Sequence, residues 1–334
     1  MKAAIFRDFN QPLEIDQVAD PRPAPDQVLI RVARCGICGS DLHMTREPAM
    51  GARPGSILGH EFAGEVVESG TQSQDFKVGD RVAVAPVRGC GQCMSCRKGE
   101  PAWCDSMLLQ GGGYAELAVA AARQCLKLPE SASVSDGALV EPLAVSLHGV
   151  ALSGLSAGMR VLVLGAGPIG LAVAFWARRL GATQVAIIDL TPLQADLARQ
   201  VGATAFVSAG EDVVARANAA LGGMPDIVFE CVGKPGILAQ ALEHVRPRGS
   251  IVMLGLCTTT DSFVPFRAVS KEVKFITSAF FNMREYESSL DVLNGGHAEA
   301  RALITDTVPL ADLPVVFESL RHRTSQCKVM VRPG

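Results

Sequence analysis

The sequence predicts an α/β protein in which a β-rich region surrounds a doubly wound parallel sheet. Short β-branched runs separated by Gly and Pro fill the first 150 residues, apolar strands alternate with helical stretches from about residue 160, and the first pattern returns near residue 280. A chain of 334 residues is long enough for two domains with their own cores. We therefore expect one domain formed by 1–147 and 281–334, and a second, inserted domain at 148–280.

Each region has a regular series of predicted elements. In the β-rich region we expect strands at 27–33, 61–69, 80–84, 114–120, 303–308 and 328–332, and a helix near 312–321. In the inserted region we expect strands at 160–165, 183–189, 205–207, 226–231, 249–255 and 272–278, with helices that include 171–180, 191–201 and 236–245. Helices between strands that recur at such intervals indicate βαβ units and a parallel sheet.

The composition excludes several classes of protein. The chain is 48% hydrophobic and 19% charged, which is typical of a globular protein. Its formal charge of −3 predicts no attraction to nucleic acid or to acidic lipid headgroups. The first residues show neither a signal core nor transit-peptide character, so the ten cysteines indicate a reducing cytoplasm. The uncharged run 161–177 is interrupted by glycines and a proline, and a buried strand followed by a helix explains it better than a membrane span.

Four closely spaced cysteines predict a structural metal site. Cys90, Cys93, Cys96 and Cys104 form the run C-x2-C-x2-C-x7-C within a lobe at 88–105. Thiolates this close in a chain without an export signal indicate one closed tetrahedral zinc site rather than a disulfide framework. Four protein ligands leave no open position, so this zinc would hold a loop together and take no part in chemistry. Ordinary reduced cysteines in a loop are the alternative.

A glycine-rich turn predicts a dinucleotide site. The motif G-x-G-x-x-G follows an apolar strand and opens a helix, and its residues are Gly165, Gly167, Pro168, Ile169 and Gly170. Glycines allow the backbone to approach a pyrophosphate, and the helix N-terminus offers free N–H groups. Asp189 ends the next strand, where a carboxylate accepts hydrogen bonds from a ribose 2′-OH and repels a 2′-phosphate. NAD is therefore favoured over NADP; a structural Gly turn with a surface Asp is the alternative.

Residues on two loops suit an open metal site. Cys38 follows a predicted strand, and His60 and Glu61 lie before the next one. A thiolate, an imidazole and a carboxylate from separate loops can hold a zinc ion that keeps a position for substrate. Spacing alone leaves the alternative of a core cysteine and a structural histidine, because the two loops need not converge.

Together these motifs resemble those of the zinc-dependent medium-chain dehydrogenases, in the branch of alcohol, polyol and threonine dehydrogenases. The residues that carry the resemblance run through the whole chain: Cys35-Gly-Ile-Cys-Gly-Ser-Asp41, Gly59-His-Glu-Phe-Ala-Gly64, the four-cysteine lobe, Glu141-Pro142 and the glycine turn. The resemblance implies a GroES-like catalytic domain around a Rossmann domain. It also implies two zinc ions per chain, one catalytic and one structural, and a homo-oligomer, either a dimer or a tetramer.

The resemblance assigns roles to individual residues. Cys38 and His60 would bind the catalytic zinc, with Glu61 or Glu141 as a further ligand; Glu141 could instead shape a helix start at Pro142. Asp41 would orient the zinc-bound histidine. Ser40 would receive the proton of a zinc-bound alcohol as it becomes an alkoxide, and His43 would pass that proton to solvent. Lys328 would lie near the pyrophosphate, and a surface lysine is the alternative for it.

The predicted reaction is the reversible oxidation of a secondary alcohol to a ketone, with hydride transfer to NAD. Apolar Met44, Phe280 and Phe281 favour a hydrophobic or cyclic substrate, unless these three are core residues. A polyol (sorbitol-like) or threonine dehydrogenase is the alternative within the family. A zinc-free quinone reductase would lack the cysteine and histidine set, and a nucleic-acid-binding zinc module would need a basic face that this chain lacks.

Overall fold

The computed structural model describes residues 1–322 and 324–334, which form two compact units. The β-rich unit comprises Met1–Glu141, Asn282–His297 and Ile304–Gly334. The parallel-sheet unit comprises Pro142–Phe281 and Ala298–Leu303. The predicted first boundary is at residue 147, whereas the units divide between Glu141 and Pro142, inside helix α3 (Val134–Leu152).

The β-rich unit is built on a seven-stranded sheet. Its strand order is β16-β17-β3-β4-β5-β9, and β8 also pairs with β3. Buried side chains from both ends of the chain form one core, to which Ile30, Phe62 and Phe317 contribute. The strands are β1 (Lys2–Ile5), β2 (Glu14–Gln17), β3 (Gln27–Gly36), β4 (Glu61–Ser69), β5 (Arg81–Val84), β6 (Val87–Arg88), β7 (Leu108–Leu109), β8 (Leu117–Ala121), β9 (Cys125–Lys127), β16 (Ile304–Pro309) and β17 (Lys328–Arg332).

Short helices close the loops of this unit. The longest of its own is α9, which begins after Asn282; the side chain of Asn282 accepts a hydrogen bond from the N–H of Glu285, as N-cap residues do. The helices are α1 (Gly39–Met44), η1 (Pro48–Met50), α2 (Met94–Arg97), η2 (Pro101–Trp103), η3 (Ala122–Gln124), α9 (Met283–Asn294), η5 (Leu310–Asp312), α11 (Leu313–Ser319) and η6 (Leu320–His322).

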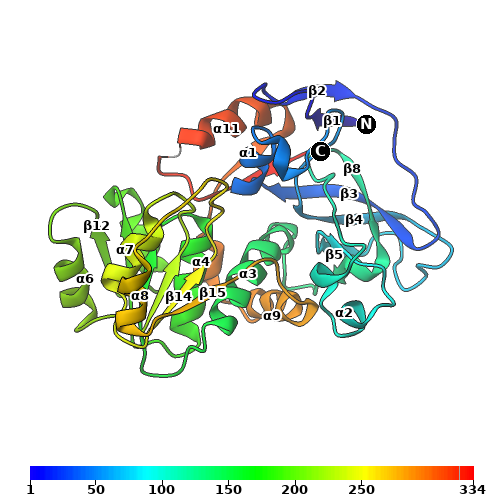
Figure 1. The fold of residues 1–334 in the computed structure, drawn as a ribbon. Coiled ribbons are helices and arrows are strands. Elements are labelled where there is room, and N and C mark those ends of the chain that lie inside the picture. Colours follow the sequence, from blue (N-terminus) through cyan, green and yellow to red (C-terminus); the bar gives the residue numbers. More distant parts are fainter. Residues whose placement is uncertain (323) are drawn as a thin grey trace. The chain divides into compact units, whose positions relative to one another are not determined.

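The parallel-sheet unit has the doubly wound arrangement (green to gold in Figure 1). All pairs in its six-stranded sheet are parallel, in the order β12-β11-β10-β13-β14-β15. The order reverses at β10, so the carboxyl end of this strand lies at the switch point where such sheets bind nucleotides. The strands are β10 (Arg160–Leu164), β11 (Gln184–Asp189), β12 (Ala205–Ser208), β13 (Ile227–Glu230), β14 (Ser250–Met253) and β15 (Lys274–Thr277).

The helices of this unit bury the apolar strands. α4 contacts β10 and β11, α6 contacts β11 and β12, and α7 contacts β13. Side chains such as Leu162, Val228 and Leu221 form the core between the sheet and the helices. The helices are α4 (Pro168–Arg179), η4 (Pro192–Gln194), α5 (Ala195–Gln200), α6 (Val213–Leu221), α7 (Ile237–His244), α8 (Pro265–Lys271) and α10 (Ala298–Arg301).

The structure confirms the α/β class and the parallel sheet, and it corrects two readings. Glu141 and Pro142 do not mark a helix start, because α3 begins at Val134 and holds Pro142 in its interior. The predicted strand at 114–120 begins only at Leu117. The uncharged run 161–177 divides into β10 and α4 as expected, and no helix among the described residues is long and apolar enough to cross a bilayer.

A matched pair of glycine substitutions tests the turn before α4. Gly170→Ala is expected to destabilise the protein by about 1–3 kcal/mol, because the added methyl group would overlap the carbonyl oxygen of Gly165. Gly167→Ala is the control: Gly167 has φ −72°, and no atom lies within 4 Å of an added Cβ. The control should change stability by less than about 0.5 kcal/mol. Equal urea-unfolding midpoints for the two variants would contradict this close packing.

Candidate active site and metal centres

The antiparallel pairing of β3 and β4 brings the predicted metal ligands together. Gly36 pairs with Glu61 in this ladder, so the residues just after β3 and just before β4 meet at one edge of the sheet. Cys38 caps α1 two residues after β3, and His60 immediately precedes β4. The two loops therefore converge, which spacing alone could not establish.

Cys38, His60 and Glu61 form a compact set of donors. One sulfur, one ring nitrogen and one carboxylate oxygen of these residues all lie within 4.8 Å of one another. His60 and Glu61 are buried, and Cys38 is partly buried. A soft thiolate, an imidazole and a carboxylate in this arrangement fit zinc, which takes four or five such ligands. Three protein ligands leave a position open.

Asp41 connects two of these ligands. Its Oδ1 lies 3.2 Å from Nδ1 of His60, and its Oδ2 accepts a hydrogen bond from the backbone N–H of Cys38 at 3.3 Å. Burial lowers the pKa of His60, but the Asp41 carboxylate outweighs burial and holds this pKa well above its usual value. Because Nδ1 is engaged with Asp41, Nε2 is the nitrogen left for a metal.

Glu61 also has a buried counter-charge. Nζ of Lys328 lies 2.7 Å from both carboxylate oxygens of Glu61 and donates to the carbonyl oxygen of Ile37 at 3.1 Å. Lys328 is 2% exposed and Glu61 is fully buried. Gly36 makes room for this pair, since a Cβ at that position would overlap Oε2 of Glu61. The structure thus places Lys328 against Glu61, and its predicted place near a pyrophosphate stays a prediction.

Glu141 lies on α3, and the charged groups of this cluster affect its pKa. Burial raises the pKa of Glu141 to about 7, with a further rise from Glu61 and an opposing effect of His60. Its carboxylate is not among the donors that lie within 4.8 Å of one another in the described part of the chain. The geometry therefore groups Glu61, rather than Glu141, with Cys38 and His60.

The predicted proton-relay residues lie on α1. The hydroxyl of Ser40 donates to Sγ of Cys38 at 3.2 Å, so it is next to the donor set. Nδ1 of His43 lies 2.8 Å from a carboxylate oxygen of Glu47, in the segment that follows α1. Within residues 1–322 and 324–334 no hydrogen bond joins Ser40 to His43. The Glu47 contact was not predicted, because Glu47 lies beyond the end of α1 and the i, i+4 spacing is a signal only within a helix.

A cavity of about 200 Å³ opens beside this cluster. Asp41, His60 and Met44 line it, and the assignment of Met44 to a substrate pocket stays a prediction. Apolar side chains dominate its other walls, and Arg53 and Ser56 add polar groups; the walls include Ile57, Leu58 and Leu109. Phe280 and Phe281 belong to the other unit, where Phe281 is 3% exposed.

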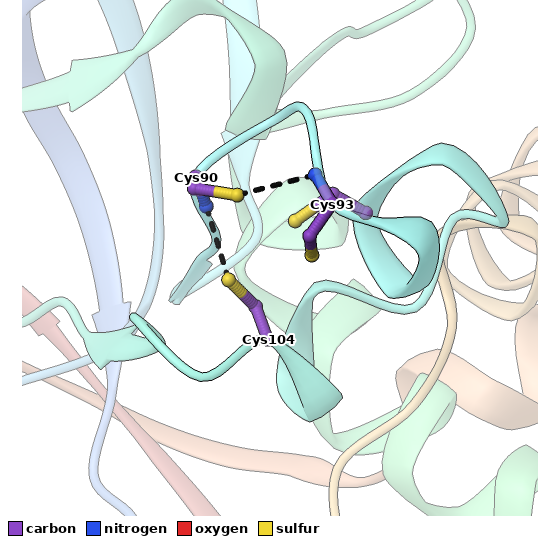
Figure 2. A group of neighbouring side chains, drawn as sticks. Cys90, Cys93 and Cys104 are labelled. Atoms are coloured by element: carbon purple, nitrogen blue, oxygen red, sulfur yellow. Dashed lines mark hydrogen bonds between the residues drawn. The ribbon is translucent and has the colours of Figure 1, made fainter.

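The four cysteines of the lobe also converge. The sulfurs of Cys90, Cys93, Cys96 and Cys104 all lie within 4.8 Å of one another. Backbone N–H groups point at these sulfurs: Cys93 donates to Cys90, and Cys90 donates to Cys104, each at 3.3 Å (Figure 2). Such bonds from Gln92 and Cys93 lower the pKa of Cys90 to about 6. Four thiols held this way fit a closed zinc site.

A hydrogen bond joins the glycine turn to Asp189 at the switch point of the parallel sheet. Gly165 has φ +98°, a left-handed conformation that favours glycine, and Gly167 precedes Pro168 at the first turn of α4. Ile169 is the next residue of the helix. Oδ2 of Asp189 accepts the N–H of Ala166 at 2.6 Å, and Oδ1 accepts the N–H of Leu190 at 2.6 Å. The acid at the end of β11 is thereby fixed against the turn.

Known families match both parts of the chain. Residues 24–130 match the model of the alcohol dehydrogenase GroES-like domain, and residues 168–295 match that of the zinc-binding dehydrogenase. The (R,R)-butanediol dehydrogenase of Bacillus subtilis (strain 168) is 33% identical over 348 residues, covering 100% of both chains. The chain belongs to the zinc-dependent medium-chain dehydrogenases. It is therefore an oxidoreductase, and the predicted family and GroES-like fold are confirmed.

Two further relatives resemble the chain, one in sequence and one in sequence and fold. The sorbitol dehydrogenase of the same Bacillus strain is 32% identical, covering 100% of this chain and 98% of the relative. A zinc-binding dehydrogenase structure from Sinorhizobium meliloti 1021, bound to NADP, superposes with a TM-score of 0.90 at 32% identity and covers 99% of each chain. The names of the two Bacillus relatives give different substrates, butanediol and sorbitol.

The buried ion pair is testable by removing its cation. Lys328→Met is expected to destabilise the metal-free protein by about 3–5 kcal/mol, because the carboxylate of Glu61 would stay buried without a counter-charge. Adding Glu61→Gln to this variant should restore most of the loss, since the uncompensated charge is then gone. Urea unfolding of the three proteins measures both effects. A loss below about 1 kcal/mol in the single variant would contradict the pairing.

Proposed function

We propose that the protein catalyses the reversible, NAD-linked oxidation of a secondary alcohol to a ketone at a zinc ion held by Cys38, His60 and Glu61. The observation that carries the proposal is the convergence of these three donors within 4.8 Å beside the cavity. In the reaction the alcohol loses one proton from oxygen and one hydride from carbon, and the hydride reduces NAD⁺ to NADH. Glu141 is the nearby carboxylate that can take the place of Glu61 in the donor set.

When bound, zinc supplies Lewis acidity that lowers the pKa of a coordinated hydroxyl, and the nicotinamide supplies the hydride acceptor. The protein residues hold and move the proton. Ser40, beside Cys38, receives the proton of the substrate hydroxyl, and His43 releases it to solvent. The contact of Nδ1 with Glu47 leaves Nε2 of His43 to accept it. Asp41 keeps His60 in the orientation that binds metal.

The glycine turn and Asp189 support NAD as the cofactor. The turn from Gly165 to Gly170, with Ile169 and Pro168 at the start of α4, offers N–H groups to a pyrophosphate. The carboxylate of Asp189 repels a 2′-phosphate, and the adjacent Leu190 and Thr191 provide no cation for one. Lys328 remains a candidate for the pyrophosphate. The NADP bound by the Sinorhizobium relative makes the comparison of the two cofactors a necessary test.

The cavity supports a small secondary alcohol with an apolar body. Met44, Ile57 and Leu109 give it mainly apolar walls. The names of the butanediol and sorbitol dehydrogenases support a vicinal diol or polyol as the second candidate, and Ser56 and Arg53 would serve its additional hydroxyls. Threonine dehydrogenation is a further alternative of the same family.

We also propose the zinc content, the cellular compartment and the oligomeric state of the enzyme. A second zinc on Cys90, Cys93, Cys96 and Cys104 stabilises the lobe, which gives two zinc ions per chain. All ten cysteines, which lie in the described part of the chain, are free thiols, in keeping with a reducing cytoplasm. We expect a homo-oligomer, either a dimer or a tetramer, without a nucleic-acid or membrane partner; light scattering tests the oligomeric state.

Zinc content separates the two proposed sites. The purified protein should contain two zinc ions per chain by elemental analysis. His60→Ala should remove one of them and abolish turnover, because it deletes a ligand of the open site. Cys96→Ser should remove the other and lower the thermal midpoint. A wild-type zinc count of zero would refute both sites, and a full count in His60→Ala would refute the catalytic one.

Turnover across a panel of alcohols tests substrate and cofactor. Absorbance at the reduced-nicotinamide band should rise with NAD and linear or cyclic secondary alcohols, and kcat/KM should be higher than with NADP. Asp189→Ser should reduce the preference for NAD over NADP at least tenfold, because the carboxylate that repels the 2′-phosphate is lost. Turnover of polyols alone would shift the assignment to polyol dehydrogenase. A wild-type preference for NADP would overturn the role of Asp189.

A further inference from the structure

Tyr114 lies in the hydrophobic core of the β-rich unit and contacts Asp41. Its hydroxyl donates to Oδ2 of Asp41 at 2.7 Å, across 73 positions of sequence, and lies 3.5 Å from the carbonyl oxygen of Gly36. Tyr114 has no exposed surface, and Asp41 is 1% exposed. A hydroxyl so deeply buried loses water as a partner, so the short contact with a carboxylate is its main hydrogen bond.

Asp41 relays this contact to both metal ligands. While Oδ2 accepts from Tyr114 and from the N–H of Cys38, Oδ1 is next to Nδ1 of His60. Asp41 is carried by α1, a helix of six residues that is too short to be rigid on its own. The phenol therefore holds a carboxylate whose orientation the helix alone would not fix.

The ring of Tyr114 is itself held in place. Gly59, with φ +81°, packs directly on it, and a Cβ there would lie 2.5 Å from Cδ1 and 2.7 Å from Cε1 of the ring. Phe317 contacts the ring edge-on, with centroids 6.3 Å apart and an angle of 84°. The backbone of Tyr114 also donates to Leu58 at 3.1 Å. Tyr114 thus contacts the turn that carries His60 through its ring and Asp41 through its hydroxyl.

We propose that Tyr114 is a positioning residue for the catalytic metal: its hydroxyl fixes the Asp41 carboxylate so that His60 presents Nε2 to the ion. This inference rests on the metal site of the proposed function. The effect resides in one oxygen atom, because a phenylalanine would fill the same space against Gly59 and Phe317. Outer hydrogen-bond partners of metal ligands typically change metal affinity 10- to 100-fold.

Tyr114→Phe tests the inference through metal binding, independently of turnover. Competition with a chromophoric chelator should show zinc held at the Cys38–His60 site at least tenfold more weakly than in the wild type. Zinc at the four-cysteine lobe should be unchanged, which provides an internal reference in the same molecule. In the cobalt-substituted protein, the d–d bands of the catalytic site should shift while the thiolate bands of the lobe stay constant.

Two further variants separate positioning from general loss of packing. Asp41→Asn should weaken zinc binding, and adding Tyr114→Phe to it should produce no further loss, since the phenol acts through the carboxylate. Val66→Ala removes buried volume from β4 in the same core and should lower the thermal midpoint without changing zinc affinity. If the effects of Tyr114→Phe and Asp41→Asn add, or if Val66→Ala weakens zinc equally, the inference is overturned.

The same measurements distinguish this inference from the proposed function. His60→Ala must lose the zinc ion of the same site at which Tyr114→Phe weakens zinc binding. If His60→Ala retains two tightly bound zinc ions, the proposed catalytic site is wrong. If His60→Ala loses one ion while Tyr114→Phe binds zinc with wild-type affinity and an unchanged cobalt spectrum, the site stands and only the role of Tyr114 fails.

Discussion

The pairing of β3 with β4 is the constraint on which the chemistry of this protein depends. The ladder sets Gly36 opposite Glu61, and every member of the donor set lies within a few residues of that pair. Glycine at position 36 is required by the same geometry, because the carboxylate of Glu61 occupies the space that a side chain would take. A shift of the register by one residue would move Glu61 to the opposite face of the sheet and separate the ligands.

Buried charge is the second theme of the site. Asp41, Glu61, Glu141 and Lys328 are all at most 7% exposed, together with His60. Such a cluster is costly to desolvate, and it is tolerated because Asp41 pairs with His60 and Glu61 pairs with Lys328. The raised pKa of Glu141 shows which member is least well compensated. An array of this kind specifies one arrangement of ligands, while an apolar core of similar volume would leave their orientations free.

The sequence allowed the parallel sheet and its glycine turn to be predicted well, because β-branched runs and the G-x-G-x-x-G context depend on local chemistry. Strands at 61–69 and 328–332 have the predicted bounds. Helix α3 was missed because its 19 residues are apolar on nearly all sides and contain Pro142, so neither periodicity nor a proline-free run marked it. The contact of Tyr114 with Asp41 and the contact of Lys328 with Glu61 could not be predicted, since each joins residues that are distant in sequence.

The bonding of Asp189 has a consequence for changing the cofactor. Both of its oxygens already accept backbone N–H groups of Ala166 and Leu190, so the acid braces the glycine turn in addition to the contact with ribose that we propose for it. Replacing it with a cationic side chain would leave the Ala166 amide without its acceptor. Engineering the enzyme toward a phosphorylated dinucleotide would therefore require a second, compensating substitution that restores an acceptor for that amide.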